Sequence, residues 1–338
     1  MGGIILLSLL GLGLTSLIFP DDDEDRADAN NQITDDDQVT FGSEDNFIFE
    51  ENNRAFLEDN NLFTDENIDN AVSLDGALNV GAGAGDDQVY GSELNDTISV
   101  GAGDDLVSGW SGDDAISGGL QNDELHGNSG EDTIRGGYGR DLIIGGDDDD
   151  LLRGGHGDDE LRGDAGAGSR YAGNDTIFGD EGNDLLFGAL GADMLHGGDG
   201  NDSIDGRDDG RDDGIADGLL GPTDSDESDE IYGDDGNDVL TLGQNDIAFG
   251  GNGSDTFQLG QWITTDNQAE IRDFDPTDDK IEVIYDQDLE DEPIVTIETS
   301  RVTDDALILI DGVVVANVIG AKNLISASDV LISQEQFG

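Results

Sequence analysis

The stretch "GGYGRDLII" at residues 136–144 decides the fold, because near-copies of it run through the middle of the chain. "GGDGNDSID" (197–205) and "GGNGSDTFQ" (250–258) repeat its glycines, its sixth-position aspartate and its apolar eighth residue. Between Asp87 and Asp159 an aspartate recurs every nine residues, and an apolar residue follows each one by two positions. Self-similarity at a fixed period predicts a structure built by stacking one small unit.

The nine-residue unit predicts a very short strand followed by a tight turn. One apolar residue per unit gives a strand with one inward side chain, and the glycine-rich half permits positive φ. Two units make one coil, and coils stacked about 4.8 Å apart form two parallel sheets. A single coil buries too little surface to be stable alone, so stability comes from its neighbours. The sequence therefore predicts an all-β parallel β-roll, a type of β-solenoid.

The charge of the chain indicates that cations complete this structure. Its 338 residues include 81 acidic and 13 basic residues, a formal net charge of −68. Each close pair of like charges costs about 1 kcal/mol even in water, yet 35% hydrophobic residues is too many for a disordered acidic tail. With no cysteine, oxygen is the plentiful ligand, and oxygen selects hard cations such as calcium. The same charge argues against a nucleic-acid partner.

The repeated aspartates are the candidate metal ligands. They fall at the turns, so those two units apart lie on the same edge of the stack, where a divalent ion between each pair would offset their repulsion. The predicted ligands are Asp87, Asp96, Asp105, Asp114, Asp123, Asp132, Asp141, Asp150, Asp159, Asp175, Asp184, Asp193, Asp202, Asp238 and Asp255.

The quoted repeats match the pattern G-G-x-G-x-D-x-U-x and resemble RTX calcium-binding nonapeptide repeats over roughly residues 80–260. The resemblance implies a right-handed parallel β-roll, multiple Ca²⁺ ions in its turns, and export by a type I secretion machinery. Gln121, Asp148 and Gln244 replace the fourth-position glycine, and we expect weaker binding at those turns.

Two insertions interrupt the predicted roll. The one near 164–172 is expected to be an extruded turn that leaves the strand order intact. The one near 206–228 lacks apolar residues at the expected positions, and is either a solvated acidic loop or an accessory ion or partner site.

The two ends differ from the roll. Residues 1–20 contain an uncharged apolar run at 3–19, which is a membrane-associated segment, an uncleaved hydrophobic tip or a cleaved signal. Residues 21–79 are predicted to be an acidic N-terminal cap or linker. In 261–338, "ALILIDGVVVANVIG" (306–320) predicts a hairpin around Asp-Gly. "EIRDFDPTDDKIEVI" (270–284) is similar to the segment that follows the roll in serralysin-like proteases. That resemblance implies a C-terminal β cap carrying an uncleaved type I export signal; a plain cap is the alternative.

No catalytic residue is identified. His126, His156 and His196 form no His-Glu-x-x-His motif. Outside the roll and its caps no stretch of roughly 150 residues is left for a catalytic domain. We therefore expect a non-enzymatic, secreted or cell-surface calcium-binding protein whose repeats fold on binding Ca²⁺. The alternatives are the RTX module of an extracellular hydrolase or epimerase-like enzyme, and a structural protein attached through residues 3–19 to a cell-surface or matrix partner.

Overall fold

The computed structural model describes residues 54–57, 61–63, 70–73, 77–164, 173–207, 228–264, 267–286, 293–321, 323–326 and 329–335. The apolar segment 1–20, most of the predicted cap 21–79, and the greater part of both insertions (165–172 and 208–227) lie outside these residues. The described part contains strands and turns, and none of it forms a helix long and apolar enough to span a membrane.

The strands belong to two sheets, as predicted for a β-roll. The first sheet is 13-stranded and contains, in spatial order, β1 (Arg54–Leu57), β3 (Asn70–Ser73), β5 (Gln88–Tyr90), β7 (Leu106–Ser111), β9 (Glu124–Ser129), β11 (Leu142–Asp147), β13 (Glu160–Arg162), β15 (Leu185–Phe187), β17 (Ser203–Asp205), β19 (Val239–Thr241), β22 (Thr256–Gly260), β24 (Lys280–Asp286) and β28 (Val330–Glu335).

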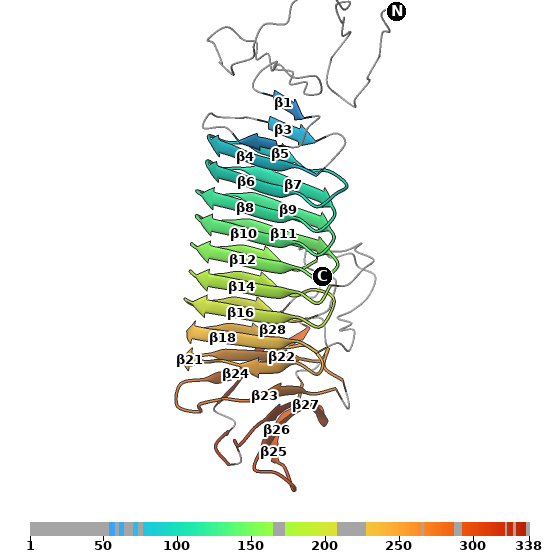
Figure 1. Ribbon diagram of the computed structural model, residues 1–338. Coiled ribbons are helices and arrows are strands. Elements are labelled where there is room, and N and C mark those ends of the chain that lie inside the picture. The colour runs from blue at the N-terminus through green and yellow to red at the C-terminus, as the bar shows by residue number, and fades with distance from the viewer. Residues whose placement is uncertain are drawn as a thin grey trace, which may run out of the picture.

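The second sheet is 15-stranded and holds the strands between them in sequence. Its main path is β2 (Asn61–Phe63), β4 (Asn79–Ala84), β6 (Thr97–Ala102), β8 (Ala115–Leu120), β10 (Thr133–Tyr138), β12 (Leu151–His156), β14 (Thr176–Glu181), β16 (Met194–Asp199), β18 (Glu230–Gly236), β20 (Ile247–Phe249), β23 (Ala269–Ile271), β27 (Val313–Val318), β26 (Ala306–Ile310) and β25 (Val295–Thr299), with β21 (Asn252–Gly253) paired to β18. Through the roll, successive strands alternate between the two sheets, which Figure 1 shows as two stacked columns of arrows.

The register follows the sequence repeat. Ile134 of β10 pairs in parallel with Ile116 on one side and Leu152 on the other. The pairing continues across both insertions, because β12 pairs with β14 and β16 pairs with β18 in the same register. The insertion near 164–172 therefore leaves the strand order intact, as predicted.

The core is a single file of apolar side chains between the sheets. Each repeat contributes its eighth residue, and burying a side chain of this size stabilises the fold by about 1.5–3 kcal/mol. These residues are at most 3% exposed: Val89, Ile98, Val107, Ile116, Leu125, Ile134, Ile143, Leu152, Leu161, Ile177, Leu186, Leu195, Ile204, Ile231, Leu240, Ala248 and Phe257. The stacking of coils, rather than any one coil, forms this core.

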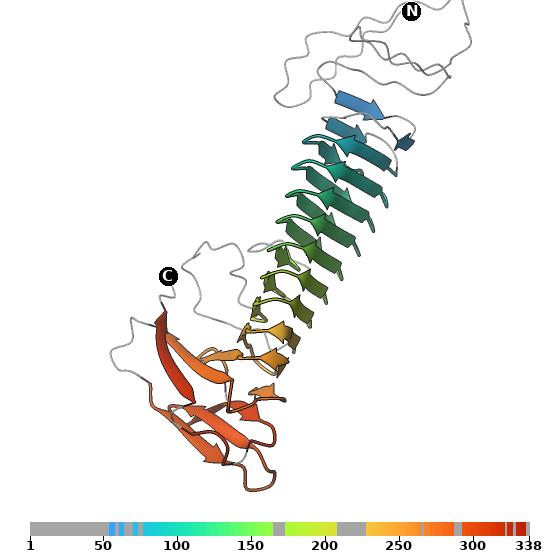
Figure 2. The ribbon, with the colours of Figure 1, turned by 90° about the vertical axis from the view of Figure 1, so that its left-hand side faces the viewer.

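The C-terminal strands continue the two sheets in parallel, and the second sheet then ends in antiparallel strands. β24 adds to β22 and β28 adds to β24, all parallel, while β27 pairs in parallel with β23. The predicted hairpin is confirmed: β26 and β27 are antiparallel, and Asp311 and Gly312 between them have φ of 51° and 85°, as a tight two-residue hairpin turn requires. Figure 2 shows these strands splayed at the end of the rod.

Candidate metal site

The predicted aspartates form two buried ladders, one along each edge of the roll where the chain turns between sheets. The first ladder contains Asp87, Asp105, Asp123, Asp141, Asp159, Asp184, Asp202, Asp238, Asp255 and Asp279. The second contains Asp96, Asp114, Asp132, Asp150, Asp175, Asp193, Asp229 and Asp246. Each of these residues is at most 4% exposed. Every predicted ligand is therefore in one of the ladders.

Each rung is fixed by main-chain hydrogen bonds to the coils beside it. The Oδ1 atom of Asp141 accepts from the backbone N–H of Asp123 at 2.9 Å, and the Asp141 N–H donates to Oδ1 of Asp159 at 2.8 Å. The Asp141 carbonyl accepts from the N–H of Glu160 at 2.8 Å. One carboxylate oxygen of each rung is thus used to hold the stack, and the carboxylate cannot rotate freely.

The ladders cross both insertions without a gap. The Asp159 N–H donates to Oδ1 of Asp184 at 2.8 Å, and the Asp193 N–H donates to Oδ1 of Asp229 at 2.7 Å. Residues 25 and 36 positions apart in sequence are therefore neighbours in the ladders.

The other oxygen, Oδ2, has no hydrogen-bond partner within the described residues in most rungs. A buried carboxylate oxygen without a partner is strongly destabilising, so each such atom calls for a cation or a proton. This orphaned Oδ2 is present in Asp105, Asp114, Asp123, Asp132, Asp141, Asp150, Asp159, Asp175, Asp184, Asp202, Asp238 and Asp255.

A main-chain carbonyl of the next coil converges on the same place. The position that a Cβ would take on Gly136 is 2.2 Å from Oδ2 of Asp141 and 2.8 Å from the carbonyl oxygen of Gly154. At Gly127 the equivalent distances, to Asp132 and Gly145, are 2.1 and 2.8 Å. Only glycine leaves this space open. The donors are all oxygen, both anionic and neutral, which is the ligand chemistry of calcium, so these residues fit the metal.

The electrostatics of the ladders disfavour a row of bare carboxylates. Burial, the largest cause, raises the pKa of Asp123 to about 8 and that of Asp175 to about 9; the neighbouring Asp193 adds to the increase at Asp175. Burial raises the pKa of Asp141 and Asp202 to about 6, partly offset by a backbone hydrogen bond to each. At neutral pH the ladders therefore favour binding of protons or metal ions.

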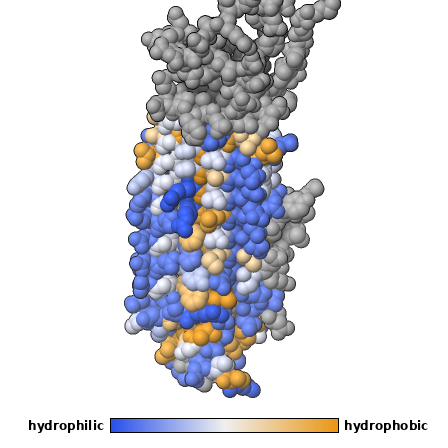
Figure 3. Space-filling view, in the orientation of Figure 1, coloured by the Kyte–Doolittle hydropathy of each residue, from blue (hydrophilic) through white to orange (hydrophobic). Residues whose placement is uncertain are grey.

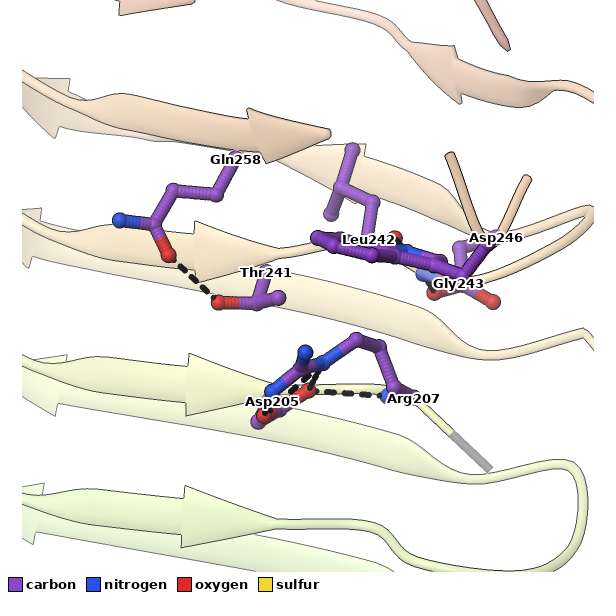
Figure 4. Close-up of polar contacts among 8 residues, drawn as sticks. Asp205, Arg207, Thr241, Leu242, Gly243, Asp246 and Gln258 are labelled. Atoms are coloured by element: carbon purple, nitrogen blue, oxygen red, sulfur yellow. Dashed lines mark hydrogen bonds and ion pairs between the residues drawn. The ribbon is translucent and has the colours of Figure 1, made fainter. Parts of the chain in front are cut away.

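Three rungs at the ends of the ladders are satisfied by the chain itself. Oδ2 of Asp96 accepts from the Ser92 N–H at 2.6 Å, and Oδ2 of Asp279 accepts from the Asp275 N–H at 2.7 Å. Oδ2 of Asp246 accepts from the Gly243 N–H at 2.5 Å, in the turn that Figure 4 shows. These N–H groups occupy the oxygen that is orphaned elsewhere, so the predicted ligand Asp96 differs from its neighbours.

Asp229, Asp246 and Asp279 are rungs that the predicted ligand set omits. Each is followed two residues later by an inward apolar residue, respectively Ile231, Ala248 and Ile281. That two-residue spacing was the signal available in the sequence, even where the glycines are lost.

The fourth-position substitutions retain the turn conformation in two of three cases. Gln121 and Asp148 both adopt positive φ, 79° and 75°, as a glycine would. Gln244 is buried, and its Oε1 accepts from the Thr264 hydroxyl at 2.6 Å. This turn belongs to a coil one residue shorter than the rest, since Asp229 and Asp246 are 17 residues apart. Weaker calcium binding at these turns stays a prediction.

The outer face of the second sheet carries a different ladder, which we call the outer stack. Phe178, His196, Tyr232 and Phe249 stack one above another with centroid distances of 5.1, 4.4 and 4.9 Å. The guanidinium groups of Arg153 and Arg272 cover its two ends, 4.1 and 5.8 Å from the terminal ring centroids. Figure 3 shows an interrupted column of hydrophobic residues along the middle of the roll, between hydrophilic flanks.

The three histidines lie on the outside of the roll, and each contacts an acidic side chain. His126 lies 3.0 Å from Glu124, His156 lies 2.8 Å from Glu181, and Asp234 is 2.9 Å from His196. They occupy different coils and do not converge on one site.

The outer face of the first sheet is polar where the second insertion leaves the roll. Arg207 forms an ion pair with Asp205 at 2.5 Å, and the Thr241 hydroxyl donates to Oε1 of Gln258 at 2.9 Å (Figure 4). The Trp262 indole N–H donates to the Leu242 carbonyl at 2.7 Å, fixing the start of the C-terminal region onto the last coils.

Comparisons with known proteins agree with the repeat assignment. The family model described as the RTX calcium-binding nonapeptide repeat (4 copies) matches residues 82–98, 90–125, 118–152, 126–161, 136–169, 171–204, 187–209 and 223–257. A search of curated proteins gave no significant match.

Two solved structures are similar to parts of the chain. The AlgE6R3 subunit of the Azotobacter vinelandii mannuronan C5-epimerase is 18% identical, with 55% of this chain and 80% of that chain covered and a TM-score of 0.21. The extracellular lipase LipA from Serratia marcescens is 19% identical over 78% of this chain and 45% of that chain, with a TM-score of 0.20. The strand pairings and the family match establish the β-roll. The repeat array of this chain belongs to the RTX calcium-binding nonapeptide repeat family.

Proposed function

We propose that this chain is a non-enzymatic extracellular protein whose β-roll assembles when calcium fills the aspartate ladders after type I export. The observation that carries the proposal is the row of buried, orphaned Oδ2 atoms, most of which face a main-chain carbonyl of the next coil. When bound, calcium supplies the positive charge that these buried carboxylates lack.

The residues of the chain divide the work. The aspartate Oδ1 atoms hold successive coils together through main-chain N–H groups, and the Oδ2 atoms with the first-position glycine carbonyls would hold the metal. The apolar file between the sheets provides the burial that makes the assembled stack stable. Because binding and stacking use the same carboxylates, the folded state and the metal-bound state are coupled.

Export through a narrow channel suits a chain that is unfolded at low calcium. The formal charge of −68 repels the coils from one another until cations are present. Extracellular calcium sites typically have dissociation constants of about 10⁻⁴ to 10⁻³ M, so they are empty in a cytosol and filled outside a cell. The non-enzymatic role is supported by the placement of the three histidines, which lie apart on the outer faces.

Circular dichroism during a calcium titration of the full chain tests the proposal. We expect little β-structure in excess chelator at neutral pH and a cooperative gain of β-structure as free calcium rises. A chain that is fully β-structured in chelator, and whose spectrum and thermal stability do not respond to calcium, would contradict it.

A further inference from the structure

Asp164 is a buried acid outside both aspartate ladders. It occupies the second position of its repeat, immediately before the first insertion. Because β11 pairs with β13, the equivalent residue of the preceding turn on the same edge is Gly146. It is 1% exposed. Its Oδ2 atom accepts from the backbone N–H of Leu190 in the next coil at 2.8 Å, which fixes the carboxylate against the roll.

Asp164 follows β13 in the turn that leads to Asp175, and Asp150 and Asp175 are consecutive rungs of the second ladder. The Asp150 N–H donates to Oδ1 of Asp175 at 2.8 Å, so the rungs are stacked directly. Both are at least nine-tenths buried, 4% and 1% exposed, and the Oδ2 atom of each is orphaned within the described residues. Two buried acceptors without a donor among the described residues therefore belong to the turn that carries Asp164 and to the turn stacked on it.

Gly163, the residue before Asp164, lies close to the sites of both of these oxygens. The Cβ position of Gly145 is 2.2 Å from Oδ2 of Asp150 and 2.6 Å from the Gly163 carbonyl. The Cβ position of Gly163 itself is 2.1 Å from Oδ2 of Asp175. Burial is the largest cause of the raised pKa of Asp150 and Asp175. The negative charge of Asp164 is a smaller cause that raises the pKa of both, so the three carboxylates are close enough to interact electrostatically.

In a regular repeat, three residues separate the second position from the sixth-position aspartate. In this repeat, residues 165–174 separate Asp164 from Asp175. A side-chain carboxylate next to the interruption can supply an oxygen ligand where the regular run of turn residues is broken.

We propose that Asp164 contributes a carboxylate oxygen to a calcium site shared with Asp150 and Asp175. The inference rests on the proposed function, and it assigns to a residue outside the nonapeptide pattern the role of a metal ligand. Calcium affinity rises with the number of charged ligands. This site has three carboxylates and so fills at lower free calcium than its neighbours, at the place where the first insertion divides the sequence of the roll.

The variant Asp164→Asn, made in the full chain, distinguishes a role of Asp164 as a calcium ligand from a role as a hydrogen-bond acceptor for the Leu190 N–H. The asparagine side chain keeps an oxygen that accepts from the Leu190 N–H but loses the negative charge. We measure bound calcium per chain by equilibrium dialysis with radioactive calcium over a range of free concentrations. The expected result is the loss of about one ion from the tightest class, with its affinity weakened at least about tenfold.

Asp158→Asn is the matched control. Asp158 is an exposed aspartate of the adjacent turn whose Oδ1 also accepts a main-chain N–H, from Asn183 at 2.9 Å. We expect its calcium isotherm to superimpose on that of the parent chain.

The outcomes distinguish this inference from the proposed function. A parent chain that binds no calcium overturns both. A parent chain that binds calcium, with an unchanged isotherm for Asp164→Asn, overturns the inference alone and leaves Asp164 as a cap for Leu190. If Asp164→Asn does not fold at saturating calcium, Asp164→Glu decides: recovery of the tight step supports a carboxylate ligand, and a folded variant without that step refutes it.

Discussion

At the residue scale, the division of labour within one carboxylate explains why the sixth-position aspartate is repeated with so little variation in the chain. Oδ1 of Asp141 is used by the Asp123 N–H, while Oδ2 is left facing the first-position glycine. Asparagine could perform the first role but not the second, since its amide carries no charge. The fifth-position residue shows the contrast. Asn183 and Asn201 accept from main-chain N–H groups two units on, but both are exposed and need no cation.

Gly136→Ala should weaken calcium binding more than it disturbs the backbone. The added Cβ would lie 2.2 Å from Oδ2 of Asp141, and positive φ does not restrict this glycine. We expect the calcium midpoint of folding to rise, with about 1–3 kcal/mol lost from the free energy of unfolding at fixed calcium. Ser99→Ala, at an exposed strand position, is the control. Equal midpoints for the two variants would show that the space above Gly136 is not part of the site.

The raised pKa values predict that, without calcium, protons bound to the buried aspartates partly stabilise the fold. In the calcium-free fold the pKa values of Asp123 and Asp150 rise from 3.8 to about 8. For such groups the stabilisation is complete below the unfolded-state pKa and is lost as the pH rises through the folded-state values. The calcium-free chain should therefore hold more β-structure near about pH 5 than near about pH 9. Circular dichroism of dialysed, metal-free protein checks this, and a pH-independent spectrum would contradict it.

At the scale of elements, the outer stack lies where the sequence is interrupted. Arg153 and Phe178 come from β12 and β14, which are separated by the first insertion, and His196 and Tyr232 come from β16 and β18, on either side of the second. Longer connections between paired strands cost more entropy. Stacking on the outer face adds contacts across those same pairs, and these contacts need no calcium.

A double-mutant cycle on Arg153 and Phe178 measures that contribution. The guanidinium lies 4.1 Å from the ring centroid, and Arg153 also pairs with Asp180 at 3.0 Å. We expect a coupling of about 0.5–1 kcal/mol between Arg153→Ala and Phe178→Ala at saturating calcium, measured by denaturant unfolding. Strictly additive losses would mean that the two side chains are neighbours without mutual stabilisation.

The sequence predicted the elements that depend on periodicity, including the strand order across the first insertion, but not the side-chain contacts on the outer face of the second sheet. The spacing of Asp141 and Ile143 was enough to predict both the ladder and the core. The outer stack could not be predicted, because Tyr232 and His196 are brought together only once the coils on both sides of residues 208–227 are paired. The sequence predicted Asp96 as a ligand but gave no sign that its Oδ2 atom is occupied, because the Ser92 N–H reaches it through local turn geometry that the motif does not encode. The same holds for the Gly243 N–H at Asp246, a rung that the predicted ligand set omits.

At the scale of the whole molecule, many similar sites on one stack predict cooperative binding. Each ion that binds the folded state alone adds to stability as free calcium rises, by about 1.4 kcal/mol per tenfold increase. The free energy of unfolding plotted against the logarithm of free calcium should therefore have a slope well above that for one ion. Magnesium should give a smaller slope, because it releases its water ligands reluctantly and demands a tighter geometry. A slope of one ion or less would show that the rungs act separately or not at all.

The short coil near the C-terminal end shows that a change in repeat spacing can remove an open carboxylate oxygen. Between Asp238 and Asp246 one residue is missing, and in that turn the Gly243 N–H occupies the oxygen of Asp246 that is left open elsewhere. A turn of altered length thus keeps its aspartate in the ladder through Oδ1, while a local N–H group occupies Oδ2. Lengthening or shortening such an array is accordingly safest in whole coils of two repeats: a change of one repeat would transfer every later strand to the opposite sheet and move the outer stack to the other side of the rod.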